Sequence, residues 1–421
     1  MIDLFFLLVL LLLLAILLRQ DWIYYLLYVV GGIYVASRGW TRHSLRALEI
    51  SRRLDSRAFA GQALEEVVFL RNRSWLPIPW LHVQEAVPLE LQERESYQVA
   101  LGLGPRSTTR HTFRLYAHRR GYFPVGPLRV TAGDLFGFAE GTWQERTPVH
   151  VTVYPKVLPL PELGLPSNLP FGTVHAPQRI FEDPTRLAGV RPYTRGDSLR
   201  HIHWRASAHE DTLLVKKFQP AIALDTTVVL DLDPEAYPVR HRFGGSEWAI
   251  TVAASLASHL VERRQAVGLL TNGWDPRAQA PAHPIPSQSG RSHLMTILEL
   301  LARIQLHKPR QAARARDETA PEPPGHSDIA LAHWLPRAGA SLTWGSTLLV
   351  ITPALDEETL WTLHRLYRRG LTVLAILVVR PPRFPALRQQ AAALGIPLFE
   401  AIWASDLREW GRRRPAPGLP G

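Results

Sequence analysis

The sequence predicts a multidomain protein: an N-terminal transmembrane helical hairpin, an antiparallel β-sandwich, and then an α/β doubly wound domain. Three observations predict this fold class. Residues 4–18 and 22–36 are two unbroken apolar runs, residues 48–157 hold short strand-like runs between turn signals, and residues 226–402 alternate buried strands with amphipathic helices. The chain has 421 residues, so more than one hydrophobic core is expected.

The two apolar runs are predicted to cross a membrane as a hairpin within residues 1–40. The polar triplet Arg19, Gln20 and Asp21 separates them, and a single long helix would place these charges at mid-bilayer, which is costly. Five arginines follow between positions 38 and 53 and favour the cytoplasmic side. The sequence therefore predicts a multi-pass protein of the cell membrane whose soluble domains are cytoplasmic. A signal peptide is disfavoured, because a basic leader and a small-residue cleavage site are missing.

Composition excludes several classes of site. Cysteine is absent, which rules out disulfides, thiolate zinc sites and a cysteine nucleophile. The formal net charge is +11, but the arginines are scattered, which favours a solvated surface suited to anionic lipid. A nucleic-acid partner is not expected, although nucleic-acid binding stays open as a third hypothesis and would weaken steeply with salt.

The body is predicted to fall into four parts. Residues 48–157 read as a β-sandwich, 158–220 as a linker with a signature motif, 221–405 as the α/β domain, and 411–421 as a disordered tail. In the α/β domain, strands are expected at residues 226–230, 266–270, 346–352 and 371–379, with a short one near 397–402. Helices are expected at 247–264, 291–304 and 356–369.

Oxygen ligands gather where two of these strands end. Asp231, Asp233 and Glu235 follow the strand at 226–230, and Thr352 and Asp356 follow another strand. Ligands of doubly wound sheets bind at the carboxyl edge, and such oxygens suit Mg²⁺. The alternative is that Asp233, Pro234 and Glu235 simply cap the following loop and helix start.

A second candidate is residues 191–219, which are rich in arginine, histidine and aromatics. His201 and His203 would share one face of a strand, with Asp197 and His209 as conceivable further ligands. The favoured interpretation is that this segment packs the linker onto the sheet domain and buries Trp204. No phosphate loop, nucleophile elbow or zinc-protease helix is present, so no enzyme class is supported.

These residues carry a family resemblance. Residues 191–208, which hold Tyr193, Gly196, Asp197, Arg200 and Trp204, followed by Leu213 to Lys216, resemble the signature of domain-of-unknown-function family 58. Residues 119–123, 126–128 and 134–138 look like the family's second signature. The resemblance implies a membrane-anchored protein whose β-sandwich is followed by a von Willebrand factor A-like domain, and it implies a MoxR-type AAA+ ATPase as partner.

One departure concerns the metal. Adhesion sites of von Willebrand factor A domains read Asp-x-Ser-x-Ser, whereas Asp233 and Glu235 occupy the serine positions after Asp231. The extra carboxylates would lower the electrophilicity of a bound cation. His209 also stands where an arginine is usual.

The predicted function is a non-enzymatic, membrane-anchored scaffold that docks a MoxR-type AAA+ ATPase for chaperone-like assembly or metal insertion. If a cation takes part, the expected one is Mg²⁺, held by the oxygens of Asp231, Asp233, Glu235, Thr352 and Asp356. The residues that support the domain or form its docking face are Tyr193, Gly196, Asp197, Arg200 and Trp204. The alternative is a metal-dependent hydrolase that uses the Asp231 cluster with His201 and His203. The oligomeric state is left open.

Overall fold

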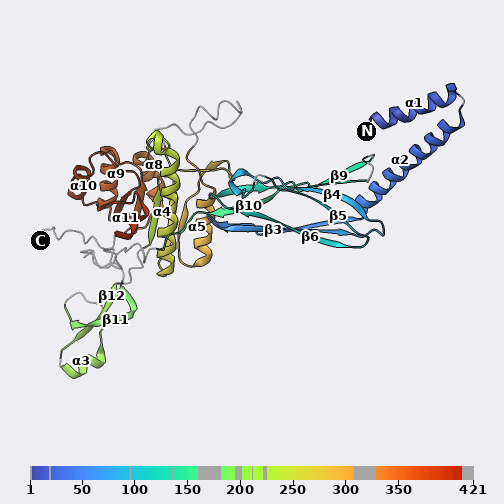
Figure 1. Ribbon diagram of the computed structural model, residues 1–421. Coiled ribbons are helices and arrows are strands. Elements are labelled where there is room, and N and C mark those ends of the chain that lie inside the picture. The colour runs from blue at the N-terminus through green and yellow to red at the C-terminus, as the bar shows by residue number, and fades with distance from the viewer. Residues whose placement is uncertain are drawn as a thin grey trace. The chain divides into compact units, whose positions relative to one another are not determined.

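Figure 1 shows the computed structural model of the chain, which describes residues 2–18, 20–94, 96–134, 137, 139–159, 182–194, 202–210, 212–220, 225–307 and 329–409. The chain divides into two compact units. The first comprises Met1–Lys156 together with Asp275–Arg277 and Leu298–Ile304, and the second comprises Val157–Trp274, Ala278–Ile297 and Gln305–Gly421. Each unit is described by itself.

The transmembrane hairpin predicted for residues 1–40 is wrong. The chain begins with two helices, α1 (Ile2–Leu18) and α2 (Asp21–Ala47), but among the residues described no helix is both long enough and apolar enough to span a bilayer. Helix α1 has 17 residues, which make about 25 Å of helix against a hydrocarbon core of roughly 30 Å. Helix α2 is longer, but tyrosines and charged residues interrupt its apolar sequence.

The second half of α2 packs against the strands that follow it. Ser37, Thr41 and Ser44 are buried, Trp40 Nε1 donates to the carbonyl oxygen of Pro77 at 2.9 Å, and Leu45 contacts the hydrophobic core. The helix therefore continues past residue 40 to Ala47, because its last turns have a partner to pack against.

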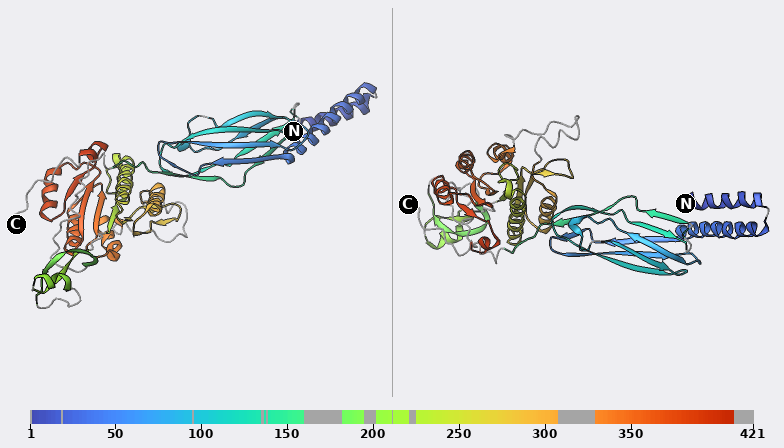
Figure 2. Two further views of the ribbon diagram at one scale, coloured as in Figure 1. Left: turned by 90° about the horizontal axis from the view of Figure 1, so that it is seen from below. Right: turned by 45° about the horizontal axis from the view of Figure 1, so that its top comes forward.

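The rest of the first unit is mostly strands. They are β1 (Leu48–Leu54), β2 (Arg57–Phe59), β3 (Ala63–Asn72), β4 (Ile78–Gln84), β5 (Gln98–Leu103), β6 (Thr108–Tyr116), β7 (Gly121–Val125), β8 (Arg129–Gly133), β9 (Glu140–Gln144) and β10 (Val149–Tyr154), with a short 3-10 helix η1 (Leu89–Leu91). They pair in the orders β1-β3-β6, β5-β4-β8-β9 and β2-β10-β7. All these pairs are antiparallel except β2 with β10, and the long strands run side by side (Figures 1 and 2).

The core of the first unit follows from alternation along the strands. Strand β3 alternates buried and more exposed positions, so Leu64, Val68 and Leu70 face inward. Glu66 lies in the same inward row and is also fully buried. A charged side chain in this row requires a partner, which is Arg52 of β1 at 3.2 Å.

The second unit is built on a six-stranded sheet of order β17-β14-β13-β18-β19-β20. Its strands are β13 (Thr226–Leu230), β14 (Val267–Thr271), β17 (Ile285–Gln288), β18 (Thr347–Thr352), β19 (Thr372–Leu377) and β20 (Leu398–Glu400). All neighbours are parallel except β17, which pairs antiparallel with β14. Strands β13, β14 and β18 are buried throughout, as expected for continuous apolar strands that are covered on both faces.

Helices cover both faces of this sheet. They are α4 (Arg242–Glu262), α8 (Leu331–Ala338), α9 (Glu357–Arg368), α10 (Phe384–Ala393) and α11 (Ala404–Glu409), with the 3-10 helices η3 (Val239–His241) and η4 (Gly339–Ser341). Helix α5 (Arg291–Arg303) begins in this unit, and its residues from Leu298 onwards belong to the first unit. Helices α8, α9 and α10 share a core with one face of β18 and β19, and α4 lies along the other face (Figure 2). The strands and helices predicted between residues 226 and 379 are confirmed to within a few residues.

Two small strand pairs complete the description. Strands β15 (Trp274–Asp275) and β16 (Ala280–Pro281) form a two-stranded pair, and β11 (Glu182–Pro192) pairs antiparallel with β12 (Leu214–Pro220). Helix α3 (Trp204–Glu210) lies between β11 and β12 in the chain. Part of the expected linker is therefore a hairpin-like element.

Candidate functional site

Three neighbouring parallel strands end on a polar residue at the carboxyl edge of the sheet. Asp231 follows β13, Asn272 follows β14, and Thr352 is the last residue of β18. The register pairs Leu230 with both Thr271 and Ile351, so the three polar residues come to the same level of the sheet. The backbone pairing alone thus gathers them at the edge where open α/β sheets bind ligands.

The carboxylate of Asp231 is the centre of this cluster. Its Oδ1 accepts hydrogen bonds from Asn272 Nδ2 at 2.8 Å and from the backbone N–H of Asp233 at 3.1 Å. Its Oδ2 lies 2.8 Å from Thr352 Oγ1. The hydroxyl of Tyr237 donates to the carbonyl oxygen of Asp231 at 2.8 Å. Because Asp231 and its three side-chain partners are all buried, the cluster joins three strands from inside the unit.

Burial raises the pKa of Asp231 to about 6, although the hydrogen bonds from Asn272, from the Asp233 amide and from Thr352 favour its charged form. Thr352 Oγ1 also lies 2.8 Å from the carbonyl oxygen of Ala354. A hydroxyl has one proton, so Thr352 donates to only one of these oxygens at a time. When Asp231 is protonated, it can donate to Thr352, and Thr352 can then donate to Ala354.

Asn272 ties the cluster to a buried histidine. Its Oδ1 accepts from the backbone N–H of Leu232 at 2.6 Å, and its backbone carbonyl lies 3.3 Å from Nδ1 of His307. His307 is buried, and its ring meets Trp274 edge to face at 5.7 Å. Burial lowers the pKa of His307, which favours the neutral ring. Because the carbonyl oxygen of Asn272 can only accept, the ring proton lies on Nδ1.

The other carboxylates of the predicted metal site have separate tasks. Asp233 is buried, and its Oδ1 accepts from the backbone N–H of Glu235 at 3.1 Å. Glu235 is exposed and pairs with Arg242 at 3.4 Å. Asp356 caps α9, since its Oδ1 accepts from the N–H of Thr359 at 2.8 Å. Asp356 therefore acts as a helix cap, whereas the capping alternative concerned Asp233 and Glu235, whose contact stays within their own loop.

In this arrangement the predicted Mg²⁺ ligands are engaged in separate hydrogen bonds and ion pairs. Asp231 Oδ1 accepts two hydrogen bonds, Oδ2 lies beside the hydroxyl of Thr352, and Glu235 and Asp356 are engaged elsewhere. No group of three or more histidine or carboxylate side chains in the described ranges could hold a metal ion. Mg²⁺ prefers about six oxygens in octahedral order, which these residues do not offer without rearrangement.

The family-like signature in residues 191–208 is described only in part. Gly196, Asp197, Arg200 and His201 lie outside the described residues. The backbone N–H of Tyr193 donates to the carbonyl oxygen of Leu213 at 2.7 Å, which places Tyr193 at the end of the β11–β12 pairing.

His203 and Trp204 begin helix α3. His203 Nδ1 accepts from the N–H of Ala206 at 3.1 Å, so this ring nitrogen stabilises the first turn of the helix. Trp204 is 66% exposed, and the expectation that it is buried is wrong. His209 is exposed in the last turn of α3.

The second family-like signature has a clear structural task within the first unit. Arg120 Nη1 donates to the carbonyl oxygens of Leu301, Ala302 and Ile304 at 2.8, 3.0 and 2.9 Å. These are among the unpaired carbonyls at the end of α5, where a cation also complements the helix dipole. The motif had suggested no such task by itself, because its partners are about 180 residues away.

Sequence reasoning missed Asn272, Tyr237 and His307. Asn272 could have been found, because it directly follows a buried strand just as Asp231 does. Tyr237 and His307 carry no local signal, since their positions depend on how the loops fold back over the sheet edge.

Part of the chain matches a known family. Residues 189–385 match the family described as "Protein of unknown function DUF58". This range holds the six-stranded sheet as far as β19, with the Asp231 cluster.

A relative extends the similarity. The chain is 24% identical over 274 residues to the "Uncharacterized protein YeaD" of Bacillus subtilis (strain 168), and the match covers 62% of this chain and 63% of that protein. The chain thus spans less than two thirds of the length of this relative.

Two solved structures each match about a quarter of the chain. The CARDB domain of a Pyrococcus furiosus protein, in complex with di-metal ions, is 16% identical with a TM-score of 0.19; the match covers 25% of this chain and 91% of that one. The β-glucosidase of Listeria innocua is 16% identical with a TM-score of 0.16, over 26% of this chain and 16% of that one. Scores this low carry no argument about function.

Proposed function

We propose that this protein is a non-enzymatic scaffold whose second unit is a von Willebrand factor A-like domain that docks a MoxR-type AAA+ ATPase, for chaperone-like assembly or metal insertion. The family model that matches residues 189–385 describes proteins of unknown function. The ATPase partner rests on the family resemblance of the signature residues.

The observation that carries the proposal is the state of the Asp231 cluster. A hydrolytic or metal-bridged site needs a carboxylate that is open towards a ligand. Asp231 is instead buried, and Asn272, Thr352 and the Asp233 amide occupy its two oxygens. These contacts support a structural role for the cluster: it holds the ends of the strands together, and the carboxyl edge of the sheet then serves as a binding surface.

Exposed apolar side chains follow two of the strands at the same edge. Val239 is 80% exposed and Phe243 55% in the segment after β13, and Trp403 is 70% exposed after β20. The two segments are linked, because Trp248 Nε1 donates to the carbonyl oxygen of Ala401 at 2.5 Å. Exposed apolar groups at one edge are typical of protein-binding surfaces.

Chemical crosslinking of the full-length chain, followed by purification and mass spectrometry, tests this function. The expected result is recovery of an AAA+ ATPase by the wild type and its loss with Trp403→Ser, because a large exposed aromatic contributes strongly to an interface. Trp344→Ser is the matched control. Trp344 is 57% exposed but precedes β18, at the opposite edge of the sheet.

Two outcomes would contradict the proposal. One is that no AAA+ ATPase is recovered with the wild-type chain. The other is that Trp344→Ser and Trp403→Ser lose the partner equally while both variants keep the wild-type circular dichroism spectrum.

Three other predictions stay untested. These are the cytoplasmic location with a membrane as partner, Mg²⁺ binding, and the metal-dependent hydrolase based on Asp231 with His201 and His203. A hydrolase would lose both its bound metal and its turnover in Asp231→Asn, whereas a scaffold would keep its partner.

A further inference from the structure

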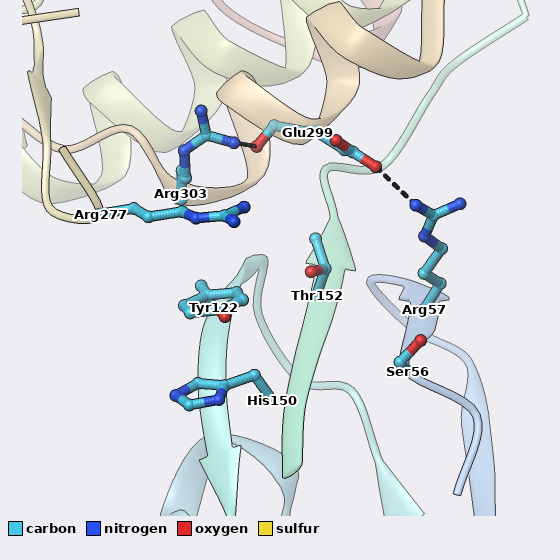
Figure 3. Close-up of a pocket in the computed structure, with 8 residues that line it drawn as sticks. All are labelled: Ser56, Arg57, Tyr122, His150, Thr152, Arg277, Glu299 and Arg303. Atoms are coloured by element: carbon cyan, nitrogen blue, oxygen red, sulfur yellow. Dashed lines mark hydrogen bonds and ion pairs between the residues drawn. The ribbon is translucent and has the colours of Figure 1, made fainter. Parts of the chain in front are cut away.

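The first unit contains a polar pocket that none of the predicted functions uses. Figure 3 shows its lining, which comes from three stretches of that unit: Ser56, Arg57, Tyr122, His150, Thr152, Arg277, Glu299 and Arg303. The pocket has a volume of about 200 Å³. An enclosed cavity of about 150 Å³ holds a benzene molecule, so the space suits a small organic ligand.

Arg277 lies against the aromatic side of the pocket. The rings of Tyr122 and His150 are stacked, with centroids 4.7 Å apart and planes 10° from parallel. The guanidinium carbon of Arg277 lies 6.0 Å from the centre of the Tyr122 ring, and Figure 3 shows its side chain extending across that ring. No carboxylate among the described residues pairs with Arg277, which is exposed.

The other two arginines are paired in different ways. Arg57 Nη2 donates to Glu299 Oε1 at 2.9 Å, and both side chains of this pair are partly exposed, so the pair is weak and readily exchanged. Arg303 is held more firmly, because its Nε donates to both oxygens of the buried Asp275 at 3.0 Å. Its Nη1 donates to the backbone carbonyl of Glu299 at 3.1 Å.

The charge of the lining favours an anion. Three arginines face one carboxylate, Glu299, and the lining stays net positive even when Asp275 is counted against Arg303. The hydroxyls of Ser56 and Thr152 add neutral donors. Guanidinium groups form strong charge-assisted bonds with tetrahedral oxyanions, and several converging donors suit phosphate better than a carboxylate.

We propose that this pocket binds a small phosphate ester, whose phosphoryl group contacts Arg277, Arg57 and Arg303 while its organic part lies beside the Tyr122–His150 stack. The inference goes beyond the scaffold function and does not depend on it. Binding would replace the Arg57–Glu299 pair with a phosphate contact, so Glu299 opposes the ligand.

Isothermal titration of the full-length chain with glycerol 3-phosphate, at constant ionic strength and pH 7, tests the proposal. The wild type is expected to bind saturably, and Arg277→Gln is expected to bind about tenfold more weakly or worse, because it removes a charge-assisted bond. Glu299→Gln is expected to bind more tightly, since it removes a negative charge and releases Arg57. Arg110→Gln, at an exposed arginine on β6 outside the pocket, is the control and should bind as the wild type does.

The opposite signs of two variants make the test decisive, because general damage to the fold would weaken binding in both. The proposal is overturned if the wild type does not bind at millimolar ligand, or if Arg110→Gln and Arg277→Gln weaken binding equally. A lipid headgroup has the same phosphoryl chemistry, so flotation with vesicles of phosphatidic acid in phosphatidylcholine forms a second arm. Binding to these vesicles without binding to the soluble ester would also overturn it.

Discussion

Asp231 accepts hydrogen bonds from groups at the ends of two neighbouring strands and from its own loop. Asn272 donates to one of its oxygens and Thr352 lies beside the other, so a single side chain links β13, β14 and β18. Thr352 can either donate to Asp231 or accept from it, because the carbonyl of Ala354 offers its hydroxyl a second acceptor. An amide in place of the carboxylate can therefore keep this network.

We predict that Asp231→Asn changes the free energy of unfolding at pH 7 by no more than about 1 kcal/mol, whereas Asp231→Ala lowers it by roughly 2–4 kcal/mol. The asparagine retains one acceptor and can donate to Thr352, but alanine leaves the amide of Asp233 without its acceptor and opens a cavity. Urea unfolding of both variants measures this. If both variants lost the same free energy of unfolding, the charge of Asp231, and not its hydrogen-bond network, would stabilise the carboxyl edge of the sheet.

The same residue predicts a pH dependence. Burial raises the pKa of Asp231 from 3.8 to about 6, so the folded state holds more protons than the unfolded state between these values. The stability of the wild type should therefore fall, relative to Asp231→Asn, as pH rises from about 4 to about 6. Urea unfolding at several pH values in this window checks the sign.

Asp356 acts on one helix rather than on a ligand. Its side chain caps α9, and we predict that Asp356→Ala lowers the free energy of unfolding by about 1 kcal/mol. Glu357→Ala is the matched control, because Glu357 is exposed in the first turn and should contribute only a few tenths of a kcal/mol through the helix dipole. Thermal unfolding of the two variants compares them, and an equal loss would argue against the cap.

At the scale of elements, the strand β14 shows how close packing fixes an edge. Gly268 lies opposite β17, where a Cβ atom would come within 2.9 Å of the carbonyl oxygen of Ile285 and 3.0 Å of the backbone nitrogen of Ser287. These neighbours are backbone atoms, so the strand itself would have to move. A glycine in a strand interior commonly marks such a close approach.

We predict that Gly268→Ala lowers the free energy of unfolding by about 1–3 kcal/mol through overpacking against β17. Gly244→Ala is expected to give the opposite sign. Gly244 lies in α4, where a Cβ atom would meet no atom within 4 Å apart from its chain neighbours and the nearby backbone of its own helix, and alanine favours the helix by up to about 1 kcal/mol. Differential scanning calorimetry separates the two. If both substitutions raised the free energy of unfolding, the predicted overpacking would be wrong, because β17 would shift away from the new Cβ atom at little cost.

How far each element could be predicted depends on how local its signal is. The strand β13 was expected at residues 226–230 and is found there. Its short run of β-branched and apolar residues is a local signal for a buried strand. The end of α2 was not foreseen, because Thr41, Ser44 and Leu45 pack on strands that lie far along the chain. The parallel pairing of β2 with β10 joins segments about a hundred residues apart and has no local signature either.

At the scale of the whole molecule, the stability of the first unit depends on a buried ionic cluster. Arg52 of β1 contacts Glu66 of β3 at 3.2 Å, Glu85 at 3.3 Å and Glu145 at 2.6 Å. One guanidinium thus faces three carboxyl groups, of which Glu66 and Glu85 are fully buried. Burial, with the charge of Glu66 next, raises the pKa of Glu85 to about 8, and burial also raises the pKa of Glu66.

We predict that the first unit loses stability as pH rises through this range. The pKa of Glu85 in the folded state lies above its ordinary value of 4.5, so the folded state holds more protons and the free energy of unfolding falls between about pH 4.5 and 8. Glu85→Gln should flatten this dependence and raise the melting temperature at pH 8. Glu65→Gln, at the exposed neighbour of Glu66, should keep the wild-type slope. Calorimetry from pH 5 to 8 measures these slopes, and identical slopes in all three proteins would refute the protonated cluster.

The sequence by itself determined the parallel strands β13, β14, β18, β19 and β20, the helices α4, α5 and α9, and the positions of Asp231 and Thr352 at strand ends, because hydrophobic periodicity is a local property. Residues 191–208 also resembled the signature of domain-of-unknown-function family 58, whose model matches residues 189–385. Only the tertiary structure decided what the polar residues do: Asp231 is enclosed by Asn272 and Thr352, Asp356 caps a helix, and Arg277 stands over Tyr122 in a pocket. These roles depend on strand register and on contacts between distant segments, and a carboxylate or guanidinium has no fixed role until its neighbours set its burial and its hydrogen-bond partners.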